Sequence, residues 1–129
     1  MSIDIRWEND ASHILRVDLI GKWDSDDIVP MLARTQQMIE QKSLSVVDMM
    51  VVVINVRSDD PPPVRVLHIL RQLVSVLENY SGVIVIVSTD LLLLVLLHLI
   101  APYYRHFGVD VLSAPTVQQA KQLLLDIRL

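Results

Sequence analysis

The sequence predicts one α/β domain with a mostly parallel five-stranded sheet, an N-terminal β-hairpin and four helices, in the order ββαβαβαβα. Two observations predict this class. Short β-branched runs alternate with longer segments whose apolar residues recur at helical spacing. The 129 residues suit a single domain, and no linker or internal repeat divides residues 1–129.

The first two strands are expected to form the hairpin. Residues 3–7 alternate apolar and polar side chains, and residues 13–20 place three apolar side chains on one face. The polar residues 8–12 between them predict a turn.

The first helix is expected to begin after Asp24, because Asp24 can cap free amides and the acids that follow suit the positive end of the helix dipole. Pro30 lies early in this helix, where proline is tolerated or produces a kink. The apolar residues at helical spacing are Ile28, Met31, Leu32, Met38 and Ile39. Residues 49–54 then form an unbroken apolar run, typical of a strand covered on both faces.

The second half of the chain continues the alternation. A proline-rich loop ends at residue 63, and a helix is predicted over residues 64–79. Residues 83–87 form the clearest central strand. Polar residues 88–90 predict the cap of a helix that extends to about residue 106.

The last strand and helix are short. Gly108 suits the end of the preceding helix, and residues 109–112 predict a strand. Thr116 and Gln119 have the spacing of a capping box, which predicts a final helix.

Composition excludes several function classes. The chain has no cysteine, which excludes disulfides and thiolate sites. The net charge is −4 without a basic cluster, so we expect no nucleic-acid partner. The three glycines are isolated, which excludes a phosphate-binding loop. No signal peptide is recognisable at the start, and we expect a cytoplasmic protein without a cofactor or a metal.

Residues 19–27 carry a resemblance to a known family. A Gly-Lys step, Gly21-Lys22, leaves the second strand and leads into an acidic helix start. Together with the element order, this resembles the SpoIIAA-like superfamily, which includes STAS and STAS/SEC14-type domains. The resemblance implies a non-enzymatic module that binds a protein partner. It also implies a candidate regulatory phosphosite at Ser58, although Asp59 and Asp60 oppose a phosphate there.

An enzyme is a more distant hypothesis. Ser88 and Asp90 follow a central strand, where open α/β sheets place ligands, and histidines occur elsewhere. However, the chain has no Gly-x-Ser-x-Gly elbow, and a helix cap explains these residues better. A hydrolase, or an active site designed on this scaffold, therefore stays the weakest alternative.

Residues 91–100 are the anomaly that a function must explain. They are apolar around the whole helix except at His98, and they are too few to span a membrane. Leu91, Leu94 and His98 share one stripe with Arg105, on a side that a globular helix usually exposes. Exposed leucines in this number predict a contact surface.

The leading hypothesis is a homodimer through this helix. The alternatives are an apolar ligand or lipid pocket between the sheet and the helices, a membrane-surface patch, and additional core. Four consecutive leucines beside a Val/Met-rich strand are also consistent with an engineered scaffold. The residues predicted to form the interface or pocket are Leu91, Leu94, Val95, His98, Met50 and Val52.

Overall fold

The computed structural model of the chain describes residues 3–9, 13–20, 25–54, 62–80 and 82–128. The strands and helices follow one another in the predicted ββαβαβαβα order. The strands are β1 (Ile3–Trp7), β2 (Ile14–Ile20), β3 (Asp48–Ile54), β4 (Val83–Val87) and β5 (Asp110–Ala114). The helices are α1 (Ser25–Lys42), α2 (Pro62–Leu77), α3 (Leu91–Arg105) and α4 (Val117–Arg128).

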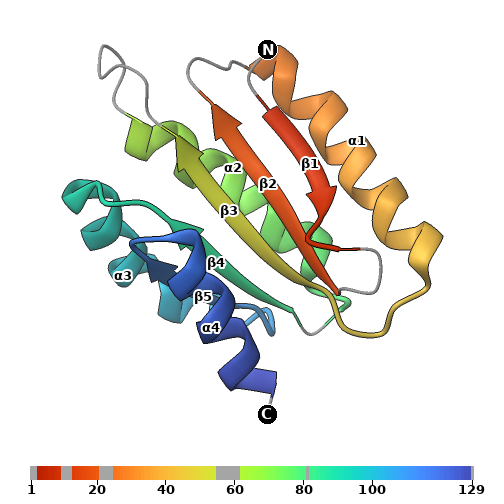
Figure 1. The fold of residues 1–129 in the computed structure, drawn as a ribbon. Coiled ribbons are helices and arrows are strands. Elements are labelled where there is room, and N and C mark those ends of the chain that lie inside the picture. The colour runs from red at the N-terminus through yellow and green to blue at the C-terminus, as the bar shows by residue number, and fades with distance from the viewer. Residues whose placement is uncertain (1–2, 10–12, 21–24, 55–61, 81, 129) are drawn as a thin grey trace.

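The five strands form one sheet in the order β1-β2-β3-β4-β5, which is the order of the chain (Figure 1). β1 and β2 are antiparallel, and every other pair is parallel. The predicted hairpin and mostly parallel sheet are therefore confirmed. β1 and β5 are the two edges of this sheet.

Each face of the sheet packs on different helices. The larger core lies between one face and helices α1, α2 and α3, which contribute residues such as Ile39, Leu73 and Leu97. The opposite face packs on α4 through Ala120 and Leu124. Alternate residues of one strand therefore belong to two separate apolar clusters, which explains the unbroken apolar run in β3.

The element boundaries lie within two residues of the predicted ones, and those of β1 and β4 match them. β5 begins and ends later than residues 109–112, and α2 begins and ends earlier than residues 64–79. The predicted capping box is confirmed, because the Gln119 amide donates to Thr116 Oγ1 at 3.1 Å. The predicted cap at Asp24 and the Gly21-Lys22 step lie outside the described residues.

Candidate functional site

Helix α3 begins where its cap was predicted. Asp90 Oδ1 accepts a hydrogen bond from the Leu93 amide at 3.0 Å. Ser88 Oγ in turn accepts one from the Asp90 amide at 3.1 Å. Ser88 is buried, and its hydroxyl is occupied in fixing the turn that leads into α3. This geometry supports a structural role for Ser88 and Asp90.

The buried and exposed sides of α3 are both apolar. Leu93, Leu97 and Tyr104 are buried in the larger core. On the outer side, four apolar side chains follow one another at a spacing of four residues and are each more than half exposed. They are Leu91 at 79%, Val95 at 56%, Leu99 at 69% and Tyr103 at 62%, and they are called the α3 stripe below.

The α3 stripe continues beyond the helix and has no charge along its length. Phe107 is 45% exposed, and its ring lies 5.4 Å from that of Tyr103 in an edge-on contact. Leu92, beside the stripe, is 58% exposed. Asp90 and Arg105 lie at the two ends of the helix. Residues 91–104 between them contain no Asp, Glu, Lys or Arg. Exposed apolar surface of this extent is typical of a contact surface.

The structure brings together some of the predicted interface residues. Leu91 and Val95 belong to the α3 stripe. Leu94 is half-buried and lines, with His98, an open groove of about 280 Å³ that also includes Leu112 of β5 and Leu123 of α4. Of the predicted row, Leu91 and His98 are exposed, whereas the contact with β5 leaves Leu94 half-buried.

Met50 and Val52 lie elsewhere. Both are buried on the face of the sheet that packs on α4, whereas α3 packs on the opposite face. The structure thus does not bring them to the α3 stripe or to one pocket with it. Ser58 lies outside the described residues. Among the residues described, no group of three or more histidine or acidic side chains is placed to hold a metal ion.

A buried polar cluster at the start of β3 was not predicted. Asp48 is fully buried, and its carboxylate lies 2.8 Å from His13 Nε2. The Val83 amide donates to Asp48 at 2.9 Å, and Arg128 of α4 donates to both carboxylate oxygens. The hydrogen bonds and charge of Asp48 raise the pKa of Arg128 against the opposing effect of burial. With these donors around it, Asp48 serves to join β2, β3, β4 and α4.

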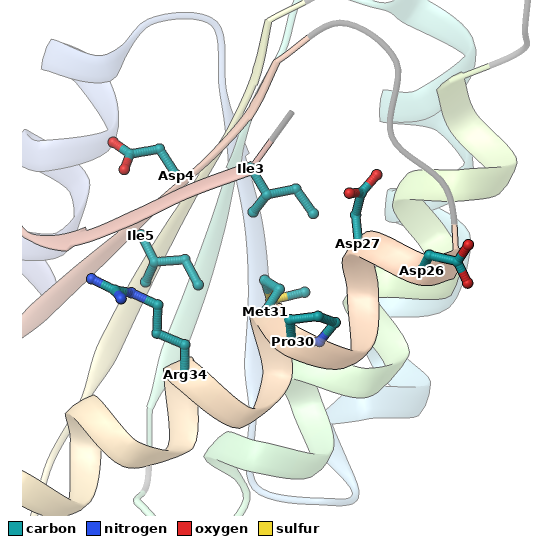
Figure 2. Close-up of a pocket in the computed structure, with 8 residues that line it drawn as sticks. All are labelled: Ile3, Asp4, Ile5, Asp26, Asp27, Pro30, Met31 and Arg34. Atoms are coloured by element: carbon teal, nitrogen blue, oxygen red, sulfur yellow. The ribbon is translucent and has the colours of Figure 1, made fainter. Parts of the chain in front are cut away.

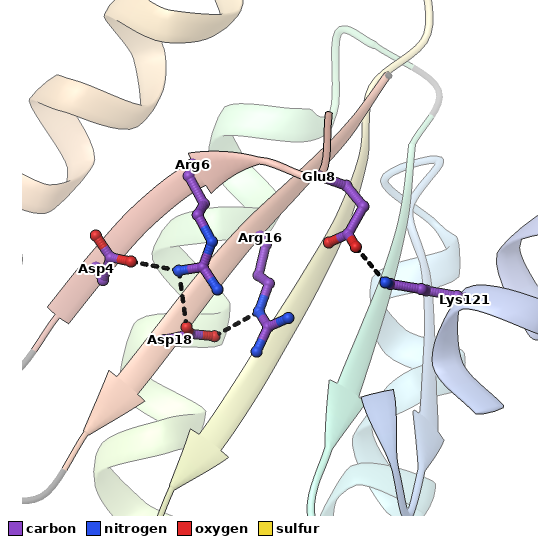
Figure 3. A network of polar contacts seen from close by, with 6 residues as sticks. All are labelled: Asp4, Arg6, Glu8, Arg16, Asp18 and Lys121. Atoms are coloured by element: carbon purple, nitrogen blue, oxygen red, sulfur yellow. Dashed lines mark hydrogen bonds and ion pairs between the residues drawn. The ribbon is translucent and has the colours of Figure 1, made fainter. Parts of the chain in front are cut away.

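A second polar network covers the outer face of the β-hairpin, where Figure 3 shows it. Asp18 is 5% exposed and accepts from Arg16 Nε at 2.9 Å and from Arg6 Nη1 at 3.0 Å. Arg6 also pairs with Asp4. Partial burial lowers the pKa of Arg6, but the two carboxylates outweigh it and raise the pKa above its usual value. The charges balance one another, so this face needs no cover from a helix.

Tyr104 makes the stability of the fold depend on pH in the alkaline range. Burial raises the pKa of the Tyr104 phenol above its ordinary value of 10.0. The folded state therefore favours the protonated phenol, and the stability that this contributes is lost as the pH rises above about 10. We expect Tyr104→Phe to flatten the fall in unfolding free energy above about pH 10.

Urea unfolding followed at each pH measures this effect. An undiminished fall in the Tyr104→Phe variant would contradict the role of Tyr104 burial.

Comparison with known protein families and with curated proteins finds no match to this chain. Within the described part of the chain, no helix has the length and apolar character needed to cross a membrane. A function for this protein therefore has to be argued from its surfaces.

Proposed function

We propose that this chain is a non-enzymatic interaction module of the SpoIIAA-like type, and that it forms a homodimer through the α3 stripe. The observation that carries this proposal is the row Leu91, Val95, Leu99 and Tyr103, exposed along the whole of α3. The ββαβαβαβα order and the mixed five-stranded sheet support the type of module.

The spacing of the α3 stripe favours packing against another helix. Residues four apart form a ridge on a helix surface, and two such ridges pack into each other's grooves when the helices cross at about 50°. The row from residue 91 to residue 103 is roughly 18 Å long, at 1.5 Å per residue. A second copy offers the same ridge, as a two-fold symmetric interface requires.

The charges at the ends of α3 favour a second copy in an antiparallel arrangement. Asp90 lies at the N-terminal end and Arg105 at the C-terminal end of the helix. In an antiparallel pair, Asp90 of one helix lies on the same side as Arg105 of the other. No like charges meet along the row. Each stripe side chain that becomes fully buried would contribute roughly 1.5–3 kcal/mol before the cost of association.

The alternative of an apolar ligand pocket has less support. Met50 and Val52, predicted to line it, are covered by α4. The groove beside Leu94 and His98 has a volume of about 280 Å³, which is just below the usual range for small-molecule sites.

Light scattering on a sizing column tests the dimer. The protein is expected to approach twice 14.7 kDa as its concentration rises through the micromolar range. Leu99→Glu should return the mass to 14.7 kDa with the fold intact, because a buried unpaired charge would oppose association.

Leu125→Glu is the matched control, since Leu125 is also an exposed leucine, at 55%, but lies on α4. This variant should dimerise as the parent protein does. A mass of 14.7 kDa at every concentration of the parent protein would refute self-association through α3.

A further inference from the structure

The edge strand β1 has backbone groups that point away from the sheet. The Glu8 amide donates to the Ile14 carbonyl at 2.9 Å, so residues 8 and 14 form a hydrogen-bonded pair. Such pairs alternate along an antiparallel ladder, and the register makes Arg6 opposite Arg16 the next bonded pair. The backbone N–H and C=O groups of the odd-numbered residues of β1 therefore face outward, at Ile3, Ile5 and Trp7.

A groove of about 430 Å³ lies between this edge and the first turns of α1. Figure 2 shows the side chains of Ile3 and Ile5 directed toward α1, with Met31 beneath them. Pro30 and Arg34 line the groove from the helix side. An added strand beside β1 would direct alternate side chains into this groove, because directly opposed residues share a face of the sheet.

The groove carries opposite charges at its two ends. Asp26 and Asp27 lie at the Ile3 end, and Arg34 reaches back toward Ile5 in Figure 2. Arg34 is exposed and makes no ion pair with any residue that the structure describes. A carboxylate is the group that best complements its guanidinium. The occupant should therefore offer an apolar side chain near Ile3 and an acidic one near Arg34.

A second copy of this chain does not suit the edge. α1 packs against β1 and, in the view of Figure 1, runs alongside it on the side away from β2. Two β1 strands paired about a two-fold axis would lie about 4.8 Å apart and bring both α1 helices to the same face. Packed helices need about 8–10 Å between their axes. An extended segment without a helix beneath it avoids this conflict.

We propose that the edge of β1 binds an extended peptide segment of a partner protein as a sixth strand, with one acidic side chain paired to Arg34. The outward backbone groups of Ile3, Ile5 and Trp7 provide the hydrogen bonds, and the groove beside α1 selects the side chains. This site is separate from the α3 stripe, which lies on the opposite side of the domain near β5. It adds a partner that self-association does not require.

Two blocked hexapeptides test the proposal by titration into isotope-labelled protein. The first is Thr-Val-Thr-Glu-Thr-Val, and the second has lysine in place of glutamate. The first peptide should shift the amide signals of Ile3, Ile5 and Trp7 in a saturable manner, with a dissociation constant of about 1 mM. The lysine peptide should bind about fivefold more weakly, and Arg34→Glu should reverse this preference.

Ile3→Pro provides a backbone test. The Ile3 N–H points away from β2, so proline should leave the hairpin folded while it removes one bond to the added strand. Ile3→Val keeps the amide and most of the apolar side chain, so this variant should bind the peptide more tightly than Ile3→Pro does.

The proposal fails if the β1 amides show no saturable shift up to about 10 mM peptide, if the shifts occur on α3 instead, or if Arg34→Glu leaves the preference unchanged. If the β1 amide signals shift with protein concentration in the absence of peptide, the edge binds a second copy of the chain. That result would also overturn the proposal.

Discussion

Gly82→Ala is expected to lower the free energy of unfolding by about 3 kcal/mol. A Cβ atom at this position would lie 2.0 Å from the Val47 carbonyl oxygen and 3.2 Å from Leu77 Cδ1. The carbonyl belongs to the backbone just before β3, so a rotamer change cannot relieve the overlap. The strand starts of β3 and β4 would have to separate, and thermal unfolding should shift down by about 10 °C.

Gly108→Ala is the matched control for this effect. Gly108 has a φ of 77°, but a Cβ atom there would meet no other atom within 4 Å. Alanine at Gly108 therefore costs only the strain of the left-handed backbone, about 1 kcal/mol. Equal losses at the two glycines, measured by urea unfolding, would contradict the close contact at Gly82.

Arg128→Gln is expected to lower the free energy of unfolding by about 2–3 kcal/mol, although Arg128 lies in the last turn of α4. Its guanidinium donates to both oxygens of Asp48, which has no solvent exposure. Removing Arg128 leaves this buried carboxylate with His13 and one backbone amide as its partners. The figure is below that for a fully buried pair because the Arg128 side chain is 31% exposed.

Lys121→Gln separates this effect from a general loss of charge on α4. Lys121 pairs with Glu8 near the surface, where ion pairs contribute less than about 1 kcal/mol. In chemical unfolding, the free energy of unfolding of Arg128→Gln should therefore be well below that of Lys121→Gln. If the two variants are equally stable, the Asp48 cluster does not hold α4 on the sheet.

The sequence predicted the elements well because each has a strong local signal. The β-branched runs of β3 and β4 and the cap at Asp90 depend on residues that are close along the chain. The surface of α3 was predicted as an anomaly for the same reason, since ten consecutive residues contain no charged side chain. Neighbouring residues in the sequence therefore sufficed to predict that this helix has an unusual surface.

The rotation of α3 and the position of α4 depend on contacts between distant residues. Which side chains of α3 face outward is set by packing on β5 and α2. The predicted row of Leu91, Leu94 and His98 therefore included the half-buried Leu94 and left out the exposed Leu99. The pairing of Arg128 with Asp48 joins residues 80 positions apart. The only local signal was an aspartate directly before an apolar run, where a buried carboxylate needs a partner.

The order of the strands has a consequence for the growing chain on the ribosome. Every strand pairs with the one made just before it, so the sheet can extend without waiting for a distant segment. The face that contains Met50 and Val85 is different, because α4, which packs on it, follows all five strands in the chain. The nascent protein therefore carries an apolar face open to chaperones or to other chains until this twelve-residue helix emerges.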